Sequence, residues 1–248
     1  MARERLRLDA LLVQRGDAPS RERARALIMA GDVLVDDRRV DKPGTRIAPD
    51  AAVRLRVPDH PYVGRGGVKL AGALDDLGID AAGLRCLDVG ASTGGFTDCL
   101  LQRGATAVTA VDVGTNQLDW RLRSDPRVRV LERTDIRKLD PADAGGPYPL
   151  ITIDVSFISL RLVLPAAVDL LEPSGRVLAM IKPQFEVGRD RVGKGGVVRD
   201  PDARQEAIDA VIAVGESLGM SFVGSVDARI AGAKKGNREH FALWISER

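Results

Sequence analysis

From Gly64 onward, short apolar segments of strand length alternate with longer segments of helical periodicity. This alternation is typical of an α/β fold with a mostly parallel sheet, because a helix must return the chain to the start of each new strand. No helical segment separates the last two strands, so we expect them to pair as a hairpin at the sheet edge. The predicted strands are residues 85–91, 107–114, 128–135, 150–156, 175–183, 222–230 and 241–247, and the predicted helices are residues 95–103, 117–123, 160–171 and 201–218.

The first 57 residues follow a different pattern, which predicts two short helices and a small sheet. The segment LDALLVQRG has the spacing of an amphipathic helix, and Ser20 is a suitable N-cap for a second helix that ends at Gly31. Extended pieces then surround an Asp-Asp turn, and the segment VRLRV alternates with period two. We predict one domain over residues 1–59, a linker over 60–63 and a second domain over 64–248.

Charge is distributed unevenly between these two parts. The whole chain of 248 residues has 37 basic and 35 acidic side chains, a net charge of +2. Residues 1–57 contain 13 basic and 9 acidic side chains, whereas the rest of the chain contains 24 and 26. The near-neutral total therefore conceals a basic N-terminal module, and such asymmetry indicates contact with nucleic acid.

The chain has too few cysteines and histidines for several classes of protein. Cys86 and Cys99 cannot form a disulfide framework, and we expect both to be small core residues. With only two histidines no zinc-binding spacing can be assembled, so we expect no metal. The longest apolar runs are far shorter than a signal peptide core or the roughly 20 residues of a membrane span. We therefore expect a cytoplasmic protein that does not enter membranes.

The N-terminal segments RLDALLVQRG and SRERARALIMAGDVLVDDRRVDKPGTRI resemble the small RNA-binding domain of ribosomal protein S4, pseudouridine synthases and tyrosyl-tRNA synthetases. The resemblance covers nearly all of residues 5–57. It implies an α+β domain whose arginines meet the phosphates of folded RNA. A surface of solvated arginines is the alternative interpretation. The RNA contacts that we predict are Arg5, Arg7, Arg21, Arg23 and Lys42, with Arg65 after the linker.

A strand, a glycine-rich turn and a helix follow one another in LDVGASTGGFTDCLLQRG. Gly90 and Gly95 have the spacing of a phosphate-binding loop, but Phe96 replaces its lysine. The turn also lacks the GxGxxG spacing of dinucleotide-binding folds. It resembles instead the first motif of S-adenosylmethionine-dependent methyltransferases. The resemblance implies a Rossmann-like class I methyltransferase domain, with a seven-stranded sheet whose last strand is antiparallel.

Acidic residues lie at the ends of the next two predicted strands. In nucleotide-binding α/β folds an acid after the second strand hydrogen-bonds the ribose hydroxyls, and Asp112 has that position. Asp135 resembles the acid that faces the adenine amino group in methyltransferases. Ordinary capping of strand ends is the alternative interpretation. The predicted site for S-adenosyl-L-methionine comprises Gly90, Ala91, Ser92, Thr93, Gly94, Gly95, Phe96, Asp112, Val113, Asp135, Ile136 and Asp154.

Two lysines lie at positions where a side chain could accept a proton from a substrate. Lys69 follows the linker, and Lys182 lies at the end of a predicted strand, directly after four apolar residues. A lysine at the mouth of a buried strand and near a second cation can accept a proton, because both surroundings disfavour the charged form. With Asp154 and Glu239 the lysines match, in chain order, the Lys-Asp-Lys-Glu tetrad of FtsJ-type ribose 2′-O-methyltransferases. We predict that these four residues are catalytic.

Nearly the whole chain resembles the TlyA, or haemolysin A, family of ribosomal RNA methyltransferases, through YVGRGGVKLAGAL, ITIDVSFISL, IKPQFEVGR and KGGVVRD. Gly64 is one departure, since the family has Ser there. The resemblance implies 2′-O-methylation of a cytidine in 16S or 23S rRNA, or both, by a protein that we expect to meet ribosomal subunits as a monomer. The loop at 184–198 either closes over RNA or is a plain loop. A pore-forming haemolysin and a non-catalytic RNA-binding protein of ribosome assembly are the alternative functions.

Overall fold

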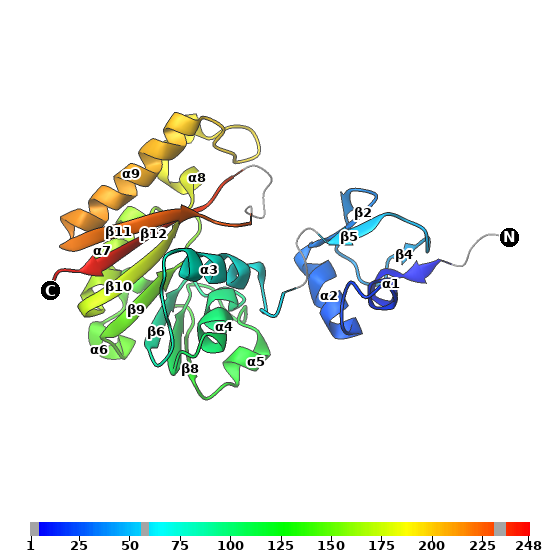
Figure 1. Ribbon diagram of the computed structural model, residues 1–248, viewed down its shortest axis with the longest axis horizontal. Coiled ribbons are helices and arrows are strands. Elements are labelled where there is room, and N and C mark those ends of the chain that lie inside the picture. Colours follow the sequence, from blue (N-terminus) through cyan, green and yellow to red (C-terminus); the bar gives the residue numbers. More distant parts are fainter. Residues whose placement is uncertain (1–4, 56–59, 231–236) are drawn as a thin grey trace. The chain divides into compact units, whose positions relative to one another are not determined.

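The computed structural model describes residues 5–55, 60–230 and 237–248. The chain divides into two compact units, Met1–Pro61 and Tyr62–Arg248 (Figure 1). The predicted domain boundary at residue 59, and residues 56 and 57 of a predicted strand, lie outside the described residues. Each unit has a hydrophobic core of its own.

The described residues of the N-terminal unit form two helices and two small sheets. Its elements are α1 (Leu8–Gln14), α2 (Arg21–Ala30), a sheet of β1 (Leu6–Arg7) and β4 (Arg46–Ile47), and a sheet of β2 (Val33–Val35), β3 (Arg38–Arg39) and β5 (Val53–Leu55). Ser20 caps α2 by accepting a hydrogen bond from the backbone N–H of Arg23 (3.1 Å), and Gly31 ends it in the left-handed conformation. Asp36 and Asp37 both have positive φ, the conformation of a tight hairpin turn between β2 and β3. The predicted helices and Asp-Asp turn are therefore confirmed.

The C-terminal unit is built on one seven-stranded sheet. Its strands are β6 (Arg85–Val89), β7 (Ala107–Val111), β8 (Val128–Leu131), β9 (Tyr148–Ile153), β10 (Leu171–Ile181), β11 (Met220–Asp227) and β12 (His240–Ser246). They lie in the order β11-β12-β10-β9-β6-β7-β8. The five strands from β6 to β10 are parallel, whereas β12 is antiparallel to both β10 and β11. The structure confirms the predicted sheet, its antiparallel last strand and the hairpin at its edge.

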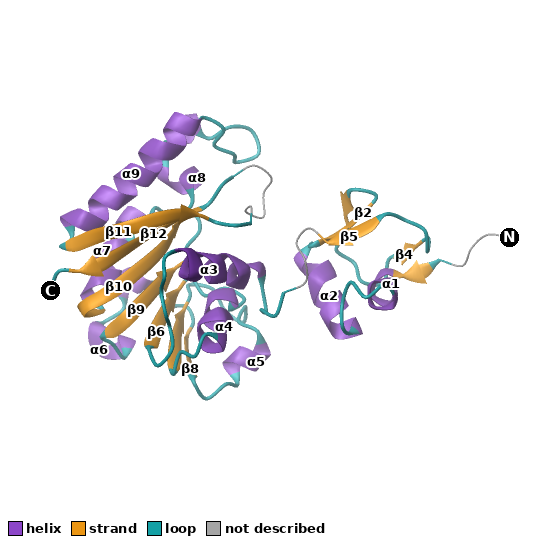
Figure 2. Cartoon of the chain, in the orientation of Figure 1, coloured by secondary structure: helices purple, strands orange, loops and turns teal. Residues whose placement is uncertain are grey.

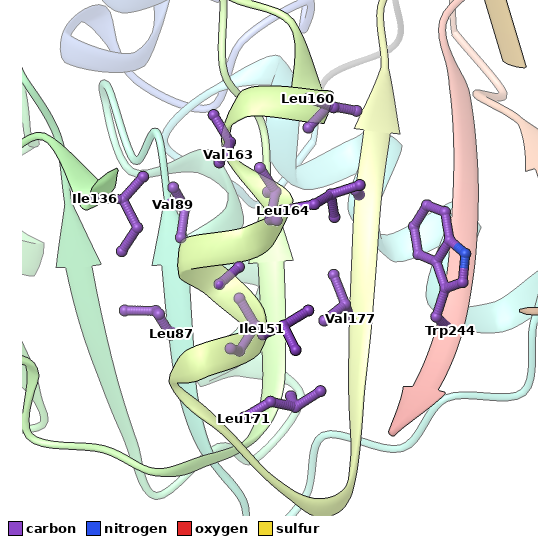
Figure 3. Packing of buried hydrophobic residues seen from close by; sticks show 14 of the residues in the cluster. Leu87, Val89, Ile136, Ile151, Leu160, Val163, Leu164, Leu171, Val177 and Trp244 are labelled. Carbon is purple, nitrogen blue, oxygen red and sulfur yellow. The ribbon is translucent and has the colours of Figure 1, made fainter. Parts of the chain in front are cut away.

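Helices cover both faces of this sheet (Figure 2). They are α3 (Arg65–Asp76), α4 (Gly95–Gln102), α5 (Trp120–Arg123), α6 (Pro141–Ala144), α7 (Leu164–Asp169), α8 (Pro183–Glu186) and α9 (Pro201–Ser217), with 3-10 turns η1 (Ile136–Lys138), η2 (Leu160–Leu162) and η3 (Arg189–Arg191). Alternate residues of each strand face opposite cores. Leu87, Ile151 and Val177 pack under α7 on one face (Figure 3), while Cys86 and Leu150 pack with α3 and α4 on the other. Burial on both faces explains why the strands are almost continuously apolar.

Five helices of the described residues differ from the prediction, and two of them, the single-turn α6 and α8, have no counterpart in it. The helix predicted at 117–123 begins only at Trp120, because Asp119 caps it by accepting a hydrogen bond from the N–H of Arg121 (2.9 Å). The helix predicted at 160–171 divides into η2 and α7, and Leu171 already belongs to β10. The sequence does not predict α3, whose three glycines give it a poor helix propensity. Packing of its apolar face against α4 and the sheet stabilises it instead.

Candidate active site

A cavity of about 680 Å³ opens at the carboxyl ends of the central strands. The chain adds β7 and β8 on one side of β6 and then places β9 on the other side. Such a reversal of strand order is where open α/β sheets bind their ligands. The predicted cofactor residues that line the cavity are Gly90, Ser92, Asp112, Val113, Asp135, Ile136 and Asp154.

The first half of the glycine-rich turn forms a wall of this cavity with its backbone. Gly90 has a φ of 85°, and a Cβ atom there would lie 2.5 Å from the carbonyl oxygen of Asp154. Glycine alone fits such a conformation and such a close approach. The N–H groups of Gly90 and Ala91 both donate to the carbonyl of Val111, at 2.8 and 3.2 Å. These bonds fix the turn against the end of β7.

The second half of the turn faces the interior of the unit. Phe96 is buried and stacks on Phe241, with 6.1 Å between the ring centroids. A Cβ atom at Gly95 would lie 2.9 Å from the backbone nitrogen of Gly67, so this glycine lets α4 pack closely on α3. The predicted cofactor residues that do not line the cavity are Ala91, Thr93, Gly94, Gly95 and Phe96.

Asp112 is held rigidly at the cavity wall by two backbone donors. The N–H of Ser92 donates to its Oδ2 and the N–H of Gly114 donates to its Oδ1, each at 2.7 Å. An ionised carboxylate offers about four lone-pair sites, so these two bonds leave it able to accept more. The hydroxyl groups of a ligand are suitable donors.

Asp135 caps a turn, which is the alternative role that the sequence allows. Its Oδ1 accepts a hydrogen bond from the N–H of Arg137 at the start of η1 (3.1 Å), and its Oδ2 forms an ion pair with the same arginine (2.6 Å). The hydrogen bond from that guanidinium lowers the pKa of Asp135. Both residues line the cavity, so Asp135 can cap the turn and also face a ligand.

The structure brings the four predicted catalytic residues together as two ion pairs. Lys182 Nζ lies 2.5 Å from Asp154 Oδ1 and donates to the hydroxyl of Ser156 at 2.8 Å. Lys69, on α3, forms an ion pair with Glu239. The lysine side chains are only 11% and 10% exposed, respectively. Each buried ammonium therefore has its own carboxylate, which avoids the cost of an unpaired buried charge.

The register of the sheet makes these two pairs neighbours. The ladder between β10 and β12 ends with Ile181 opposite His240, and Lys182 and Glu239 are the next residues along these strands. On its other side β10 pairs with β9, which ends one residue before Asp154. Because adjacent strands lie about 4.8 Å apart, Lys182 stands between the two carboxylate-bearing strand ends.

The sequence prediction misses one buried carboxyl group beside the site. Asp88, in β6, is fully buried, and its Oδ2 accepts a hydrogen bond from the hydroxyl of Thr97 (2.7 Å). Burial raises the pKa of Asp88 to about 7. The signal in the sequence is an acid within an otherwise apolar strand, two residues before Gly90 of the glycine-rich turn.

An exposed aromatic ring projects from the loop after β9. Phe157 lines the cavity, is 87% exposed and has a φ of 66°, which is rare for a bulky residue. Its ring centroid lies 5.2 Å from that of Phe185, on α8. Glu186 braces the loop by accepting hydrogen bonds from the hydroxyl of Ser159 (2.6 Å) and the N–H of Leu160 (2.8 Å). Strain that is held in this way is common at functional sites.

The segment 184–198 is tied to the chain that leads into β12. Gly193 and Val197 form a β-bridge within the segment. The buried side chain of Asn237 donates to the carbonyl of Gly196 (2.6 Å) and accepts from the N–H of Val198 (3.0 Å). The turn is therefore fastened at its base, and its closure over RNA stays a prediction.

The predicted RNA contacts of the N-terminal unit point in two directions. Arg7 and Arg21 lie against the buried side chain of Asp9. Arg23 instead donates to the carbonyl of His60 at 2.6 Å. The other predicted contacts are the exposed Arg5 and Lys42, and Arg65 at the start of α3.

Cys86 and Cys99 are buried core residues, as the sequence predicts, and burial raises the pKa of both thiols to about 12. Within the described ranges, no group of three His, Cys, Asp or Glu side chains is placed to hold a metal ion. None of the helices among these residues is long and apolar enough to cross a membrane.

Comparisons with known proteins bear on the same two units. Residues 62–245 match the family described as FtsJ-like methyltransferase, and residues 6–53 match the S4 domain. The chain is 48% identical to the 16S/23S rRNA (cytidine-2′-O)-methyltransferase TlyA of Mycobacterium tuberculosis, over 99% of this chain and 91% of the relative. It is 38% identical to the 23S rRNA (cytidine-2′-O)-methyltransferase TlyA of Campylobacter jejuni, over 78% and 74%. A solved structure from Streptococcus thermophilus is 40% identical, has a TM-score of 0.77, and covers 99% of this chain and 90% of its own.

The fold and the cavity at the strand ends define an FtsJ-like methyltransferase domain that is joined to an S4 domain. The 48% sequence identity to a TlyA protein over nearly the full length identifies the family as well as the class of methyltransferase. The chain belongs to the TlyA family of methyltransferases. The resemblance that the sequence motifs indicate is thereby confirmed.

Proposed function

We propose that this protein transfers the methyl group of S-adenosyl-L-methionine to the ribose 2′-hydroxyl of a cytidine in 16S or 23S ribosomal RNA, or in both. Membership of the TlyA family and the activities named for its relatives support the reaction and the substrate. Within this chain, the proposal is carried by the two buried lysine–carboxylate pairs beside the cavity. One chain contains every residue of this assignment, so we propose that it acts as a monomer on ribosomal subunits in the cytoplasm.

The cavity suits S-adenosyl-L-methionine in both size and chemistry. Its volume of about 680 Å³ is that of a small-molecule site. Asp112 offers oxygens to ribose hydroxyls, while Val113 and Ile136 offer apolar surface to a purine. The backbone at Gly90 can approach a ligand closely because no side chain intervenes. When bound, this cofactor supplies an electrophilic methyl group.

Lys182 is the residue placed to take the proton of the 2′-hydroxyl. Its amine contacts Asp154 and Ser156, which both line the cavity. A hydroxyl oxygen is a weak nucleophile while it keeps its proton, so a positioned base speeds its reaction. Lys182 can take this proton only as the uncharged amine, so the ammonium of the ion pair must first release its own proton to solvent. Asp154 holds the amine in place and balances the charge that it then gains.

The pair of Lys69 and Glu239 supports Lys182 from its other side. Glu239 lies opposite Lys182, one residue beyond the end of the β10–β12 ladder. On the other side of β10, Asp154 directly follows the end of β9. Lys69 reaches this strand end from α3 and fixes the carboxylate by an ion pair. The four groups together form a neutral network in which Lys182 has a defined position.

Phe157 offers a platform for the base of the target nucleotide. A nucleotide must leave its helix before its ribose can reach an enclosed cavity, and unstacking its base has a cost. Stacking on an exposed aromatic ring offsets part of that cost. The Phe157 ring is exposed at the cavity and is backed by Phe185, so we propose that the base stacks there.

Mapping of ribose methylation tests this function. Ribosomal RNA from cells that contain the protein should carry one or more 2′-O-methylcytidines that are missing when the protein is absent. The purified protein with S-adenosyl-L-methionine should restore them on unmethylated subunits. Methylation of a base atom, or identical ribose methylation in both cell types, contradicts the proposal.

The two alternative functions predict different results. A pore-forming haemolysin should release dye from liposomes, whereas the methyltransferase should not. A non-catalytic RNA-binding protein should fail to bind S-adenosyl-L-methionine in a calorimeter even when RNA is present. Retained cofactor binding without leakage supports the methyltransferase.

A further inference from the structure

Three arginines of the N-terminal unit share one buried carboxylate. The side chain of Asp9 has no exposed surface, and its oxygens accept hydrogen bonds from Arg7 (3.0 Å, twice), Arg21 (3.3 Å) and Arg25 (3.2 Å). The three arginine side chains are 45%, 54% and 52% exposed. We call Arg7, Arg21 and Arg25 the arginine triad. The triad presents three positive charges to solvent around one hidden negative charge.

Local structure explains how these residues meet. Arg21 and Arg25 are one helical turn apart on α2, so they project from the same side of the helix. Asp9 lies in the first turn of α1, and Arg7 directly precedes that helix. Arg23 lies between the two helical arginines in sequence and therefore projects elsewhere, where it contacts the carbonyl of residue 60. The helix thus separates the triad from the arginine that contacts the linker.

Asp9 sets the spacing of the triad. Three guanidinium groups repel one another, and one carboxylate cannot neutralise them all, so the cluster keeps a net charge of about +2. The paired hydrogen bonds from Arg7 hold the pKa of Asp9 well below its usual range, so the carboxylate stays ionised. The arginines therefore lose much of their side-chain freedom before any ligand binds, which lowers the entropic cost of binding.

A further basic residue lies beside the triad. The N–H of Asp9 donates to the carbonyl of Pro43 (3.1 Å), and a Cβ atom at Gly44 would lie 3.3 Å from Arg7 Nη1. The loop that carries these residues also carries the exposed Lys42. This loop therefore brings the backbone next to Lys42 close to the triad.

We propose that the arginine triad binds phosphates of ribosomal RNA, that Arg25 is one of its contacts, and that Asp9 is a positioning residue for all three guanidinium groups. This inference rests on the proposed function and deepens it. Guanidinium groups bind phosphate oxygens through paired, charge-assisted hydrogen bonds, and contacts to the backbone fix the orientation of a protein on folded RNA.

The substitution Asp9→Asn separates positioning from net charge. It removes a negative charge, so an effect of net charge alone would tighten RNA binding. Loss of positioning has the opposite effect: the dissociation constant for unmethylated ribosomal subunits should rise about five- to tenfold. The single-turnover rate at saturating subunits should stay at the wild-type value. A merely structural role would reduce the amount of active protein and would leave the dissociation constant unchanged.

Asp37→Asn is the matched control. It makes the same change in charge within the same unit, at an exposed ion pair with Arg54 (2.7 Å). Its dissociation constant should not rise. Tighter or equal binding by Asp9→Asn relative to this control overturns the positioning role.

Arg25→Gln provides a second test that does not depend on a buried residue. RNA binding should weaken, and the slope of log K against log salt should fall in magnitude by about 0.7 to 0.9 for one lost phosphate contact. Arg54→Gln, which removes an exposed arginine elsewhere in the unit, should leave that slope unchanged. Equal slopes for the two variants overturn the assignment of Arg25. Failure of the wild-type protein to bind or methylate subunits would instead refute the proposed function.

Discussion

The two units of this protein combine basic side chains with carboxylates in different proportions. In the N-terminal unit, three half-exposed guanidinium groups share the buried Asp9. In the C-terminal unit, two largely buried lysines are matched one to one with Asp154 and Glu239. An excess of exposed positive charge attracts a polyanion, whereas lysines that are matched one to one with carboxylates can be buried without an unpaired charge. In the roles proposed above, the proportion of charges and their burial separate RNA binding from chemistry.

The largest effect should come from Lys182→Ala. Without the amine the 2′-hydroxyl keeps its proton, and the single-turnover rate should fall by about 10²- to 10⁴-fold. Calorimetry should show that S-adenosyl-L-methionine still binds, because Lys182 is not among the residues that line the cavity. Lys138→Ala changes an exposed lysine on η1 and should keep the wild-type rate. Near-normal methylation by Lys182→Ala would remove this lysine from the mechanism.

The one-to-one matching of charges predicts a large effect on stability. Glu239→Gln leaves Lys69 buried without its counter-charge, so the free energy of unfolding should fall by about 3 to 5 kcal/mol. The double variant Lys69→Met, Glu239→Gln removes both charges and should recover most of this loss, while methylation stays impaired. Urea unfolding measures both changes. A double variant as unstable as the single one would show that the charges are not matched.

Phe157→Ala should weaken RNA binding without changing its salt dependence. Stacking of one base contributes about 1 to 3 kcal/mol, so the dissociation constant should rise about 5- to 150-fold. No charge is lost, so the slope of log K against log salt should equal that of the wild type. A variant of the arginine triad should instead have a smaller slope. Phe157→Tyr keeps the ring and should bind normally. Titrations at several salt concentrations test this, and a reduced slope for Phe157→Ala would contradict it.

Asp88 differs from Asp9, Asp154 and Glu239, because its buried carboxyl group accepts a hydrogen bond from the hydroxyl of Thr97 and not from a basic side chain. Burial raises its pKa to about 7, from an ordinary value of 3.8. Between these values the folded state holds a proton that the unfolded state releases. The group's contribution to stability is therefore complete below about pH 4, and it is lost as the pH rises toward 7, by about 1.4 kcal/mol per pH unit.

Asp88→Asn removes this titration. The difference in unfolding free energy between the variant and the wild type should shift in favour of the variant as the pH rises from about 5 to about 7. Urea unfolding at several pH values measures the difference. Parallel pH profiles would show that Asp88 is already ionised in the folded protein.

The sheet and the place of the tetrad follow from the sequence because they depend on local patterns. Apolar segments mark the strands, and Asp154 and Lys182 directly follow two of them. The carboxyl ends of parallel strands share one edge, so these residues must be close. Which lysine pairs with which acid depends on tertiary packing, because Lys69 reaches Glu239 from α3, a helix that the sequence does not predict.

The dependence on tertiary packing also explains why the sequence does not predict the direction of some side chains or the arginine cluster around Asp9. The glycine-rich turn is recognisable as a motif, but the direction of each side chain is not, and Phe96 packs into the core instead of lining the cavity. Asp9 is one acid in a short amphipathic helix, and its position reveals nothing of the arginines that another helix brings to it. Burial and charge pairing are properties of the folded chain.

The separation of binding from chemistry is tested most directly by comparing Lys182→Ala with Asp9→Asn on unmethylated ribosomal subunits. The dissociation constant and the single-turnover methylation rate are measured for both variants and the wild type. Lys182→Ala should lose the rate and keep the dissociation constant, whereas Asp9→Asn should keep the rate and show weaker binding. A change in the same constant for both variants would contradict the division of roles between the two units.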